Sequence, residues 1–422
     1  MTTISDPPAE SFKLSMLIYD TRYRSMTIQV VALIGFMLLV GFLVNNTAQN
    51  LATSGKTVSF GFLANPAGYD INQTLIDYNN QHSHFRASFV GLLNTLLVAV
   101  LGCITATVIG VIIGVLRLSP NWLIAKLTAV YVEMFRNVPV LLWIVFSMAI
   151  LIETLPAPRD FRGEDPAATM NLFDSVAVTN RGVYVPEALF SRSLGDVHLF
   201  GNSPIRFDIS LDLVLILAVL IASIFGIRAV RTRADAQQEK TGVRPKTWYL
   251  TLGILVVPLL VVLVALGFHL GYPELKGFNF SGGTYLRNSL IALWLALSLY
   301  TAAFIAENVR AGILAISKGQ TEAAAALGLR SNRIMSLVIL PQAMRVIIPP
   351  LISQYLNLTK NSSLAIAVGY MDLTGTLMGI TLNQTGKELE TLLLGMLVYL
   401  IISLSISTLM NWYNNRVKLV ER

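Results

Sequence analysis

Eight long apolar stretches dominate the sequence, and they constrain the fold more than any other feature. A helix needs about 20 mainly apolar residues to span a bilayer, and each stretch is close to that length. They lie at about residues 28–45, 88–116, 122–153, 211–228, 248–270, 285–306, 342–358 and 391–410. Charged residues make up only 13% of the chain, against about 25% in soluble globular proteins. We therefore expect an all-α integral membrane protein with about eight transmembrane helices.

The positions of the positive charges predict how the chain crosses the membrane, because cytoplasmic loops carry an excess of Lys and Arg. Basic residues gather before the first apolar stretch, in the connection 229–247 and at the C-terminal end. They are Lys13, Arg22 and Arg24, then Arg231, Arg233, Lys240, Arg244 and Lys246, and finally those within 414–422. Both termini are therefore expected in the cytoplasm, with 46–86 and 154–210 outside. The net charge of +7 then reflects membrane topology and lipid contact, and no nucleic-acid partner is expected.

One segment does not fit the simple pattern of spans and loops. Residues 359–390 mix apolar and polar side chains, so we expect a broken or re-entrant part of the seventh span. Irregular backbone is tolerated at membrane depth where it lines a cavity. The two halves of the chain show no strong repeat, so the inverted-repeat plan of many secondary transporters has no support.

The stretch GQTEAAAALGLRSNRIMSLVILPQA, residues 319–343, lies on the predicted cytoplasmic side between two apolar stretches. Its alanine run favours a helix with a small-residue face that another backbone can approach closely. Gly328 is placed to end this helix in a left-handed cap, and Ser331 or Asn332 can begin a second helix. We expect a helical hairpin suited to a groove on a partner. The alternative is a stable loop between two spans, with no partner.

This stretch resembles the signature loop of ABC importer permeases, in which E-A-A-x-x-x-G is followed by nine residues and a hydrophobic segment ending in Leu-Pro. The matching residues are Glu322, Ala323, Ala324, Gly328, Leu340 and Pro341, with Val338 where the family usually has Ile. The resemblance implies that the loop, bounded at 307–341, couples a permease to a separate ATPase subunit.

The segment just before this loop resembles the polar amino-acid uptake branch of the same family. It contains A-E-x-x-R-x-G-I within 300–313, where that branch ends a span. Glu307 and Arg310 are three residues apart, so they face the same side of a helix. A structural role is favoured for them over contact with substrate, and a surface ion pair at the end of the span is the simplest alternative.

A second segment, YVEMFRNVPVLLW at 131–143, resembles the branch's E-x-F-R-G-T-P-L-L. It contributes Glu133, Arg136 and Pro139 as structural or gating residues. Pro139 removes a helix hydrogen bond, so we expect it to kink the third span. A kink with a buried Glu133–Arg136 pair accounts for this segment as well as a direct substrate role does.

A polar stretch within the predicted membrane, 353–375, resembles the K-x-[ST]-S-L segment of the branch. Polar groups at this depth are costly and are functional candidates by default, although they can also hydrogen-bond between helices as packing contacts. The neutral Gln354 and Asn361 stand where carriers of cationic substrates can have acidic residues, which implies a broad site. The candidate pathway residues are Tyr300, Thr301, Gln354, Asn357, Lys360, Asn361, Ser362 and Ser363.

The resemblance implies a type I ABC importer permease, closest to the larger permease subunits of the general L-amino-acid transport system. Its five-helix core would comprise the second, third, sixth, seventh and eighth spans, with one N-terminal and two inserted helices. The expected regions are 1–87 with the first span, 88–153 as the first part of the core, 154–284 as the insertion, and 285–422 as the second part with the coupling loop.

The family implies the partners as well. A second homologous permease would complete the pathway across the bacterial inner membrane as a heterodimer, and two ATP-binding subunits would drive it. A periplasmic binding protein would deliver the L-amino acid to the two permeases. The expected mechanism is alternating access, biased only by the differential energies of ATP and substrate for the two states. The alternative is an ion-coupled secondary transporter, whose deep carboxylate candidates here are Glu133 and Asp372.

Other patterns do not predict chemistry in this chain. SGKT at 54–57 resembles the end of a phosphate-binding loop, but Asn50 stands where that motif needs Gly. ATP and Mg²⁺ are therefore expected in the partner ATPase alone, and no catalytic activity is expected here. His82 and His84 form H-x-H, with no nearby Cys or carboxylate to complete a metal site, so no metal is expected.

Overall fold

The computed structural model describes residues 15–417, except 56, 164 and 202. Lys13 and residues 418–422, which entered the prediction of orientation, lie outside the described residues, as does Lys56 of the SGKT pattern. The chain divides into two compact units, Met1–Phe60 and Gly61–Arg422. Unit 1 holds one long helix, and unit 2 holds the rest of the described helices and strands.

Unit 1 consists of the short helix α1 (Met16–Tyr19) and the long helix α2 (Thr21–Thr53). The helix is longer than the apolar stretch 28–45 because it continues into polar sequence at both ends. The large apolar side chains between Ile28 and Val44 are exposed. A helix of this length and composition has the bilayer hydrocarbon as its natural surroundings.

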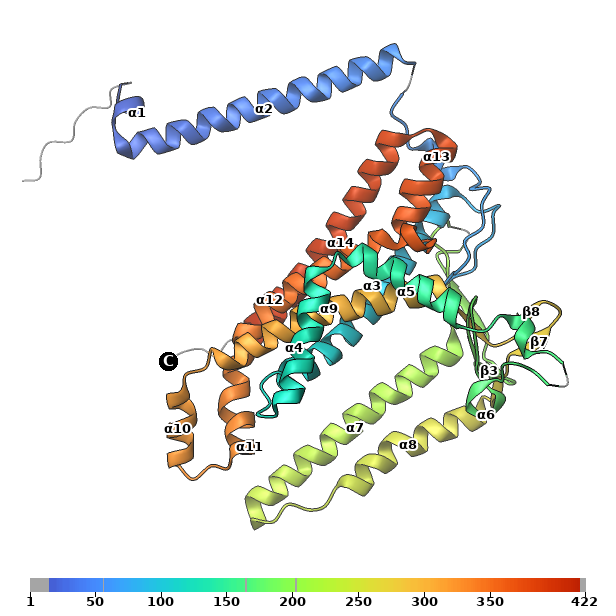
Figure 1. Cartoon of the computed structure of the whole chain (residues 1–422), viewed down its shortest axis with the longest axis vertical. Helices are drawn as coiled ribbons and strands as arrows, with labels where there is room; N and C mark the ends of the chain where they lie inside the picture. Colours follow the sequence, from blue (N-terminus) through green and yellow to red (C-terminus); the bar gives the residue numbers. More distant parts are fainter. Residues whose placement is uncertain (1–14, 56, 164, 202, 418–422) are drawn as a thin grey trace, which may run out of the picture. The chain divides into compact units, whose positions relative to one another are not determined.

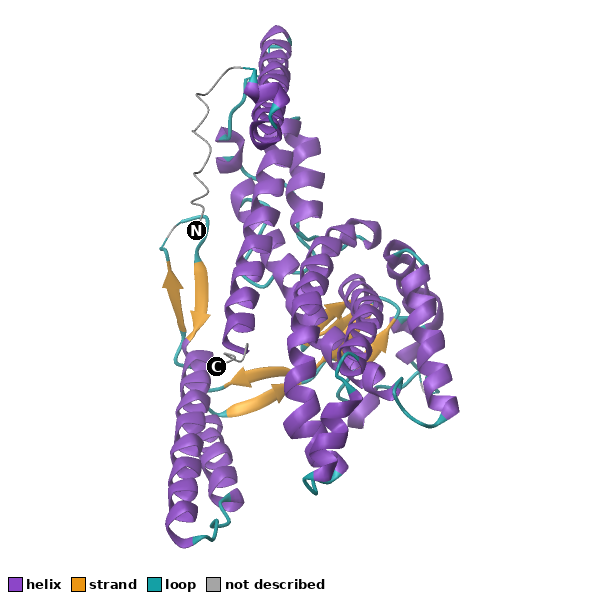
Figure 2. Cartoon of the chain, turned by 90° about the vertical axis from the view of Figure 1, so that its left-hand side faces the viewer, coloured by secondary structure: helices purple, strands orange, loops and turns teal. Residues whose placement is uncertain are grey.

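Among the described residues, eight helices are long and apolar enough to span a membrane, which confirms the expected number. Helices make up most of unit 2, as Figure 2 shows. The long ones are α3 (His84–Leu116), α5 (Val140–Thr154), α7 (Leu211–Thr241), α8 (Trp248–Ala265), α9 (Asn288–Leu314), α12 (Leu340–Asn361) and α14 (Glu388–Val417). Their ends differ from the predicted ones by several residues. Helices α7 and α9 continue past the apolar stretch into polar sequence, whereas α8 ends at Ala265, before the predicted 270.

The third predicted span, 122–153, is two helices and not one. Helix α4 (Trp122–Asn137) ends before Pro139, and α5 begins at Val140. Figure 1 shows the chain changing direction between them. The expected kink at Pro139 is thus a complete break: Val138 and Pro139 are both extended, with ψ of 134° and 137°. The residue before a proline is disfavoured in the helical region, which explains why the break includes Val138.

The core of unit 2 lies between α3 and α9, and it depends on small residues. A Cβ added at Gly110 would lie 2.7 Å from Cβ of Ile305, and one added at Gly114 would lie 2.7 Å from the carbonyl oxygen of Ala306. The backbone of α3 at these glycines therefore lies directly against α9, and membrane helices commonly pack this closely where one of them has glycine. Val98, Leu293, Leu297 and further buried residues of α3, α5, α9 and α12 complete one apolar cluster.

Helices α7 and α8 form a hairpin beside this core. Among the described residues, neither contributes to the main apolar cluster, and no residue of α8 is buried. Both are rich in exposed Leu, Val and Ile. Their apolar surfaces therefore suit contact with lipid, which agrees with the prediction of two added helices.

The described residues include nine short strands, none longer than four residues, which were not part of the expected all-α fold. They lie at one end of unit 2, in 177–210 and 268–287, and every pairing is antiparallel. Sheets have the orders β1-β2-β9, β3-β6, β4-β5 and β7-β8. Their bounds are β1 (Ala177–Thr179), β2 (Gly182–Val185), β3 (Glu187–Phe190), β4 (Asp196–Leu199), β5 (Phe207–Ser210), β6 (Phe268–Gly271), β7 (Glu274–Lys276), β8 (Asn279–Ser281) and β9 (Thr284–Arg287).

Two short turns lie between α5 and the first strand. They are the 3₁₀ turn η2 (Pro158–Phe161) and α6 (Asn171–Asp174). In α6, Leu172, Phe173 and Asp174 all have φ between 52° and 58°, a region that costs non-glycine residues energy. The side chains of Leu172 and Phe173 are exposed. No helical or strand periodicity predicts such a turn.

The two ends of unit 2 differ in structure, and Figure 1 shows both. We call the end that carries the nine strands the strand end. The opposite end carries α10 (Lys318–Ala326) and α11 (Ser331–Ile334), and we call it the loop end. Helix α9 runs from β9 at the strand end to α10 at the loop end, so it connects the two.

The seventh span is broken, as the mixed composition of 359–390 predicts. After α12 the chain forms the 3₁₀ helix η4 (Ser362–Val368), turns at Gly369 with φ of +68°, and continues as the π-helix η5 (Thr374–Thr381) and α13 (Leu382–Thr385). A segment beginning with η1 (Gly61–Ala64) covers this part. Its Tyr69 donates a hydrogen bond to the carbonyl oxygen of Thr376 at 3.4 Å.

Candidate functional site

The predicted coupling loop is a helical hairpin at the loop end. Gly328 has φ of +78°, so it ends α10 in the left-handed conformation that its position predicts. Its N–H donates to the carbonyl oxygen of Ala325 at 2.9 Å. A Cβ at Gly328 would meet nothing within 4 Å, so glycine is favoured there by backbone conformation and not by space. The second helix, α11, begins at Ser331 as expected, although no side chain caps its N-terminus.

The hairpin has an inner and an outer face. On the inner face, Ala324 is buried with Ile334 and Ile339. On the outer face, Glu322 and Ala323 are exposed. Leu327 at the tip is 82% exposed. The inner face therefore holds the hairpin to its own chain, and the outer face presents one carboxylate, small side chains and an apolar tip.

The Leu-Pro pair at the end of the motif begins α12. Leu340 and Pro341 follow directly on the π-helix η3 (Met335–Ile339). A proline has no N–H, and its ring collides with the carbonyl four residues earlier in a regular α-helix. That carbonyl belongs to Leu337, inside η3. In a π-turn the backbone hydrogen bonds join residues five apart in place of four. The turn therefore accommodates Pro341 without ending the helix.

A network of three charged residues joins α3 to α9 just before the hairpin. Glu307 accepts from Arg310 at 2.7 Å, and it also pairs with Arg117, which follows the last residue of α3. Exposed fractions of these side chains are between 13% and 33%. Charge-assisted bonds of this kind are stronger than neutral ones. The network therefore fixes the end of α9, from which the coupling loop begins, to the neighbouring helix.

The segment that breaks between α4 and α5 does not contain the expected buried ion pair. Glu133 and Arg136 are both exposed, and they form no ion pair within the described chain. Arg136 lies over the ring of Phe304 at 5.4 Å, and Glu133 accepts from Asn137 at 3.4 Å. The break at Pro139 changes the helix direction at this point, so the two charged groups are left on the surface of α4.

Polar residues of α12 lie on two different faces. Gln354, Asn357 and Asn361 are three and four residues apart, which places them on one face of the helix. Lys360 is six residues from Gln354, which turns it toward another side of the helix. There it lines a groove of about 490 Å³ with Met378 of η5 and residues of α14. The predicted pathway set is thus divided, because the candidates span more than one helix face.

The other pathway candidates have local partners. Ser362 is buried and donates to the carbonyl oxygen of Thr359 at 2.7 Å, and Ser363 donates to that of Lys360 at 2.7 Å. Tyr300 packs in the apolar cluster that α9 shares with α4. Thr301 is 3% exposed within α9. The hydroxyl groups of Ser362 and Thr301, which are both buried, are available to a ligand only if the helices move apart.

A buried carboxylate occupies the break in the seventh span. Asp372 is 0% exposed. It accepts a hydrogen bond from the N–H of Gly375 at 2.8 Å and one from the hydroxyl of Tyr399 at 3.1 Å. Asn94 of α3 donates to the carbonyl oxygen of Met371 at 2.9 Å. A buried carboxylate with such partners is stabilised in place, so Asp372 links the break to α14.

Comparisons with known proteins now decide the family. Residues 248–419 match the family model described as the binding-protein-dependent transport system inner membrane component. Over its whole length, the chain is 60% identical to the glutamate/glutamine/aspartate/asparagine transport system permease protein BztB of Rhodobacter capsulatus, covering 100% of both chains. The chain belongs to the amino-acid ABC importer permeases.

Two further relatives match this permease over nearly its full length. The general L-amino acid transport system permease protein AapQ of Rhizobium johnstonii is 43% identical, over 98% of the permease and 96% of the relative. The putative amino-acid ABC transporter permease protein YhdX of Escherichia coli is 44% identical, over 97% and 98%. Large permeases of the general L-amino-acid type are therefore among its relatives, as the predicted plan of a five-helix core with added helices implies.

Family membership establishes the permease as the non-catalytic, multi-pass inner-membrane subunit of an ATP-driven amino-acid importer. Such a subunit works with an ATPase and a binding protein. The two histidines of H-x-H have partners within the permease: His84 pairs with the hydroxyl of Thr381 at 3.1 Å, and His82 accepts from the N–H of Asn79 at 3.0 Å.

Sequence reasoning missed the polar residues that hold the strand end of the permease together. Arg86 is the clearest example, since it is 3% exposed at the beginning of α3. One signal was available: a cation at the outer end of a predicted span opposes the positive-inside rule. Tyr399 and Asn94 had no such signal, because single polar residues in apolar helices more often pack between helices.

Proposed function

We propose that the outer face of the hairpin α10–α11 docks into a groove of the ATPase and carries its motion to the membrane helices. The observation that supports this most is the combination of exposed Glu322 and Leu327 with a buried inner face. A rigid small-faced element transmits motion better than a mobile loop. The network around Glu307 then passes the motion to α3 and α9.

We further propose that a second, homologous permease completes the pathway as a heterodimer and that the two halves alternate in access. The five-helix core would be 88–153 with 285–422, and 1–87 and 154–284 would be additions. Packing supports this division, since α3, α5, α9 and α12 share one apolar cluster. In native mass spectrometry, the purified complex is expected to contain one copy each of two different permeases. A complex with two copies of this chain alone would contradict the proposal.

The substrate class is proposed from the relatives' names. They are named for glutamate, glutamine, aspartate and asparagine or for L-amino acids in general, and we propose a broad range of L-amino acids. The neutral Gln354, Asn357 and Asn361 on one face of α12 can hydrogen-bond a substrate without selecting its charge. ATP and Mg²⁺ would be bound by the partner ATPase and not by this chain.

The proposed energy source is tested by reconstituting the permease with its ATPase, second permease and binding protein in liposomes. Uptake of a radiolabelled amino acid is expected to require ATP on the ATPase side and to be independent of a proton gradient. Uptake that continues without ATP and follows the proton gradient would instead support an ion-coupled secondary transporter. The same vesicles without the binding protein are the control for leakage.

We propose that the loop end and both termini face the cytoplasm and that the strand end faces the periplasm. The basic connection 229–247 supports this orientation. In a Cys103→Ser background, Ser281→Cys at the strand end is expected to react with a membrane-impermeant maleimide in intact spheroplasts. Gly319→Cys at the loop end is expected to react only after permeabilisation. The reverse pattern of labelling would refute the orientation.

A further inference from the structure

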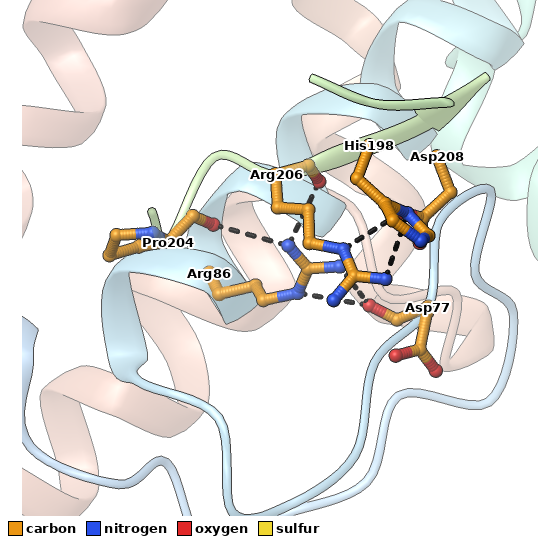
Figure 3. A network of polar contacts seen from close by, with 6 residues as sticks. All are labelled: Asp77, Arg86, His198, Pro204, Arg206 and Asp208. Atoms are coloured by element: carbon orange, nitrogen blue, oxygen red, sulfur yellow. Dashed lines mark hydrogen bonds and ion pairs between the residues drawn. The ribbon is translucent and has the colours of Figure 1, made fainter. Parts of the chain in front are cut away.

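The strand end contains a buried arginine that the transport mechanism does not use. Arg86 is the third residue of α3, and its guanidinium donates only to backbone carbonyl oxygens. The carbonyl oxygen of Asp77 accepts from Nε at 2.9 Å and accepts a second bond from Nη2. Nη1 donates to the carbonyl oxygens of Pro204 at 3.4 Å and Arg206 at 3.0 Å (Figure 3). Arg86 therefore holds together α3, the segment before it and the loop before β5.

The positive charge of Arg86 has no carboxylate partner. Within the described chain Arg86 forms no ion pair. Figure 3 shows the carboxylate of Asp77 turned away from the guanidinium, although the Asp77 carbonyl is bonded to it. A buried charge without a counter-ion is costly. The N-terminus of a helix also carries a partial positive charge, so the position of Arg86 at the start of α3 adds to this cost.

A second arginine lies close by, but its charge is already matched. Arg206 donates from Nε to Asp208 at 2.8 Å. Hydrogen bonds from Arg206 and from His198 hold the pKa of the Asp208 carboxyl below its usual value, so Asp208 stays ionised and neutralises Arg206. Nδ1 of His198, the imidazole bonded to Asp208, also lies 3.0 Å from Nη2 of Arg206. The unmatched positive charge at this place is therefore that of Arg86.

Both arginines line a cavity of about 320 Å³ that opens at the strand end. The cavity also presents hydroxyl, amide and imidazole groups, from Ser83, Ser203, Gln81 and His82. Pro204 and Asp77 complete its lining, and the Asp77 carboxylate is turned away from the guanidinium of Arg86. Sites for small molecules in proteins have volumes of about 300–1,000 Å³, so this one can hold a small molecule. Four N–H groups of Arg86 donate to carbonyl oxygens, and an arginine has five, so one remains for a ligand.

We propose that this cavity binds the carboxylate group of a small molecule of amino-acid size. A carboxylate supplies the negative charge that Arg86 lacks, and charge-assisted bonds to guanidinium are among the stronger ones. The hydroxyl and amide groups of the cavity can donate to the same carboxylate oxygens of the ligand. Neutral donors would therefore surround the ion pair between this carboxylate and Arg86. The inference relies on the proposed function only for placing this cavity on the periplasmic side, where substrate arrives.

The test is equilibrium binding to the complete purified complex in lipid nanodiscs, with no ATP and no binding protein. Isothermal titration with glutarate, a dicarboxylate of five carbons, is expected to show binding. Cadaverine, the diamine of the same length, is expected to show none. Equal binding of both compounds, or none of glutarate, would overturn the proposal. Binding of glutarate only after the binding protein is added would overturn it too, and would assign the cavity to protein docking.

Two variants assign the binding to this cavity and not to the membrane pathway. Gln81→Glu places a carboxylate in the cavity without touching the bonds of Arg86, and like charges in contact repel strongly. It is expected to weaken glutarate binding about tenfold or more. Asn72→Asp adds the same charge on the same segment outside the cavity and is the matched control. Affinity of Gln81→Glu equal to that of Asn72→Asp would overturn the assignment.

A third variant examines the cation itself. Arg86→Gln is expected to abolish glutarate binding, because it removes the unmatched charge. Since Arg86 also holds three segments together, the melting temperature of the complex is measured alongside. If Arg86→Gln unfolds the complex, Gln81→Glu still decides the proposal. Failure of glutarate binding leaves ATP-driven uptake by the reconstituted complex unaffected, so the two proposals are tested separately.

Discussion

Glu322→Lys is expected to abolish association of the permease with its ATPase. Glu322 lies exposed on the outer face of α10, where its carboxylate can meet a cation on the partner. Reversing the charge removes that attraction and introduces repulsion. Losing one member of a buried interfacial pair costs about 2–5 kcal/mol, which corresponds to roughly 30-fold weaker binding or more. The direct measurement is co-purification of the ATPase with the permease, together with ATP-dependent uptake in liposomes.

A matched control for this variant is Glu239→Lys. Glu239 is an exposed glutamate of α7, in the basic connection on the proposed cytoplasmic side, so the same charge reversal occurs outside the coupling loop. ATPase association and uptake are expected to stay near the unsubstituted level. Membrane insertion of both variants, followed by the amount of permease in the membrane fraction, should be equal. Normal ATPase association of Glu322→Lys would refute the docking role of α10.

The sequence predicts those features of the fold that depend on residues close together in the chain. It does not predict those that depend on residues far apart. The number of long apolar helices and the left-handed glycine at 328 depend on neighbouring residues alone, and both predictions are confirmed. The prediction of one helix over 122–153 is wrong, because the chain breaks at Pro139. The pairing of β2 with β9 joins Gly182 to Arg287, residues that are far apart in the chain. Strands of three or four residues are too short to show the alternation that identifies a strand.

The candidate site shows the same dependence on range. Glu307 and Arg310 pair because they are three residues apart on one helix. The third member, Arg117, joins them from another helix, and no local pattern indicates it. The expected Glu133–Arg136 pair is wrong although its spacing is also three, because side chains on a helix surface have other partners, here the ring of Phe304. Spacing predicts which residues can meet, and tertiary packing selects among them.

Gly110→Leu is expected to destabilise the permease strongly, because Gly110 lies where α3 and α9 approach each other closely. A Cβ at this position would lie 2.7 Å from Cβ of Ile305 and 2.9 Å from the carbonyl oxygen of Ala302. The Cβ of Ile305 and the backbone of Ala302 are fixed by α9, so they cannot move aside as the end of a flexible side chain can. Overpacking of a core costs about 1–3 kcal/mol. A larger loss is expected here, because α3 and α9 must separate along their length.

The measurement is the melting temperature of the detergent-solubilised complex, followed by fluorescence-detected size exclusion. Gly253→Leu in α8 is the matched control, since a Cβ there meets nothing within 4 Å and the added side chain can face lipid. Its melting temperature is expected to stay close to that of the unsubstituted complex. Gly110→Ala is expected to fall between the two, because the conflict begins at Cβ. If Gly110→Leu melts no lower than Gly253→Leu, close approach of α3 and α9 is not what holds the core together.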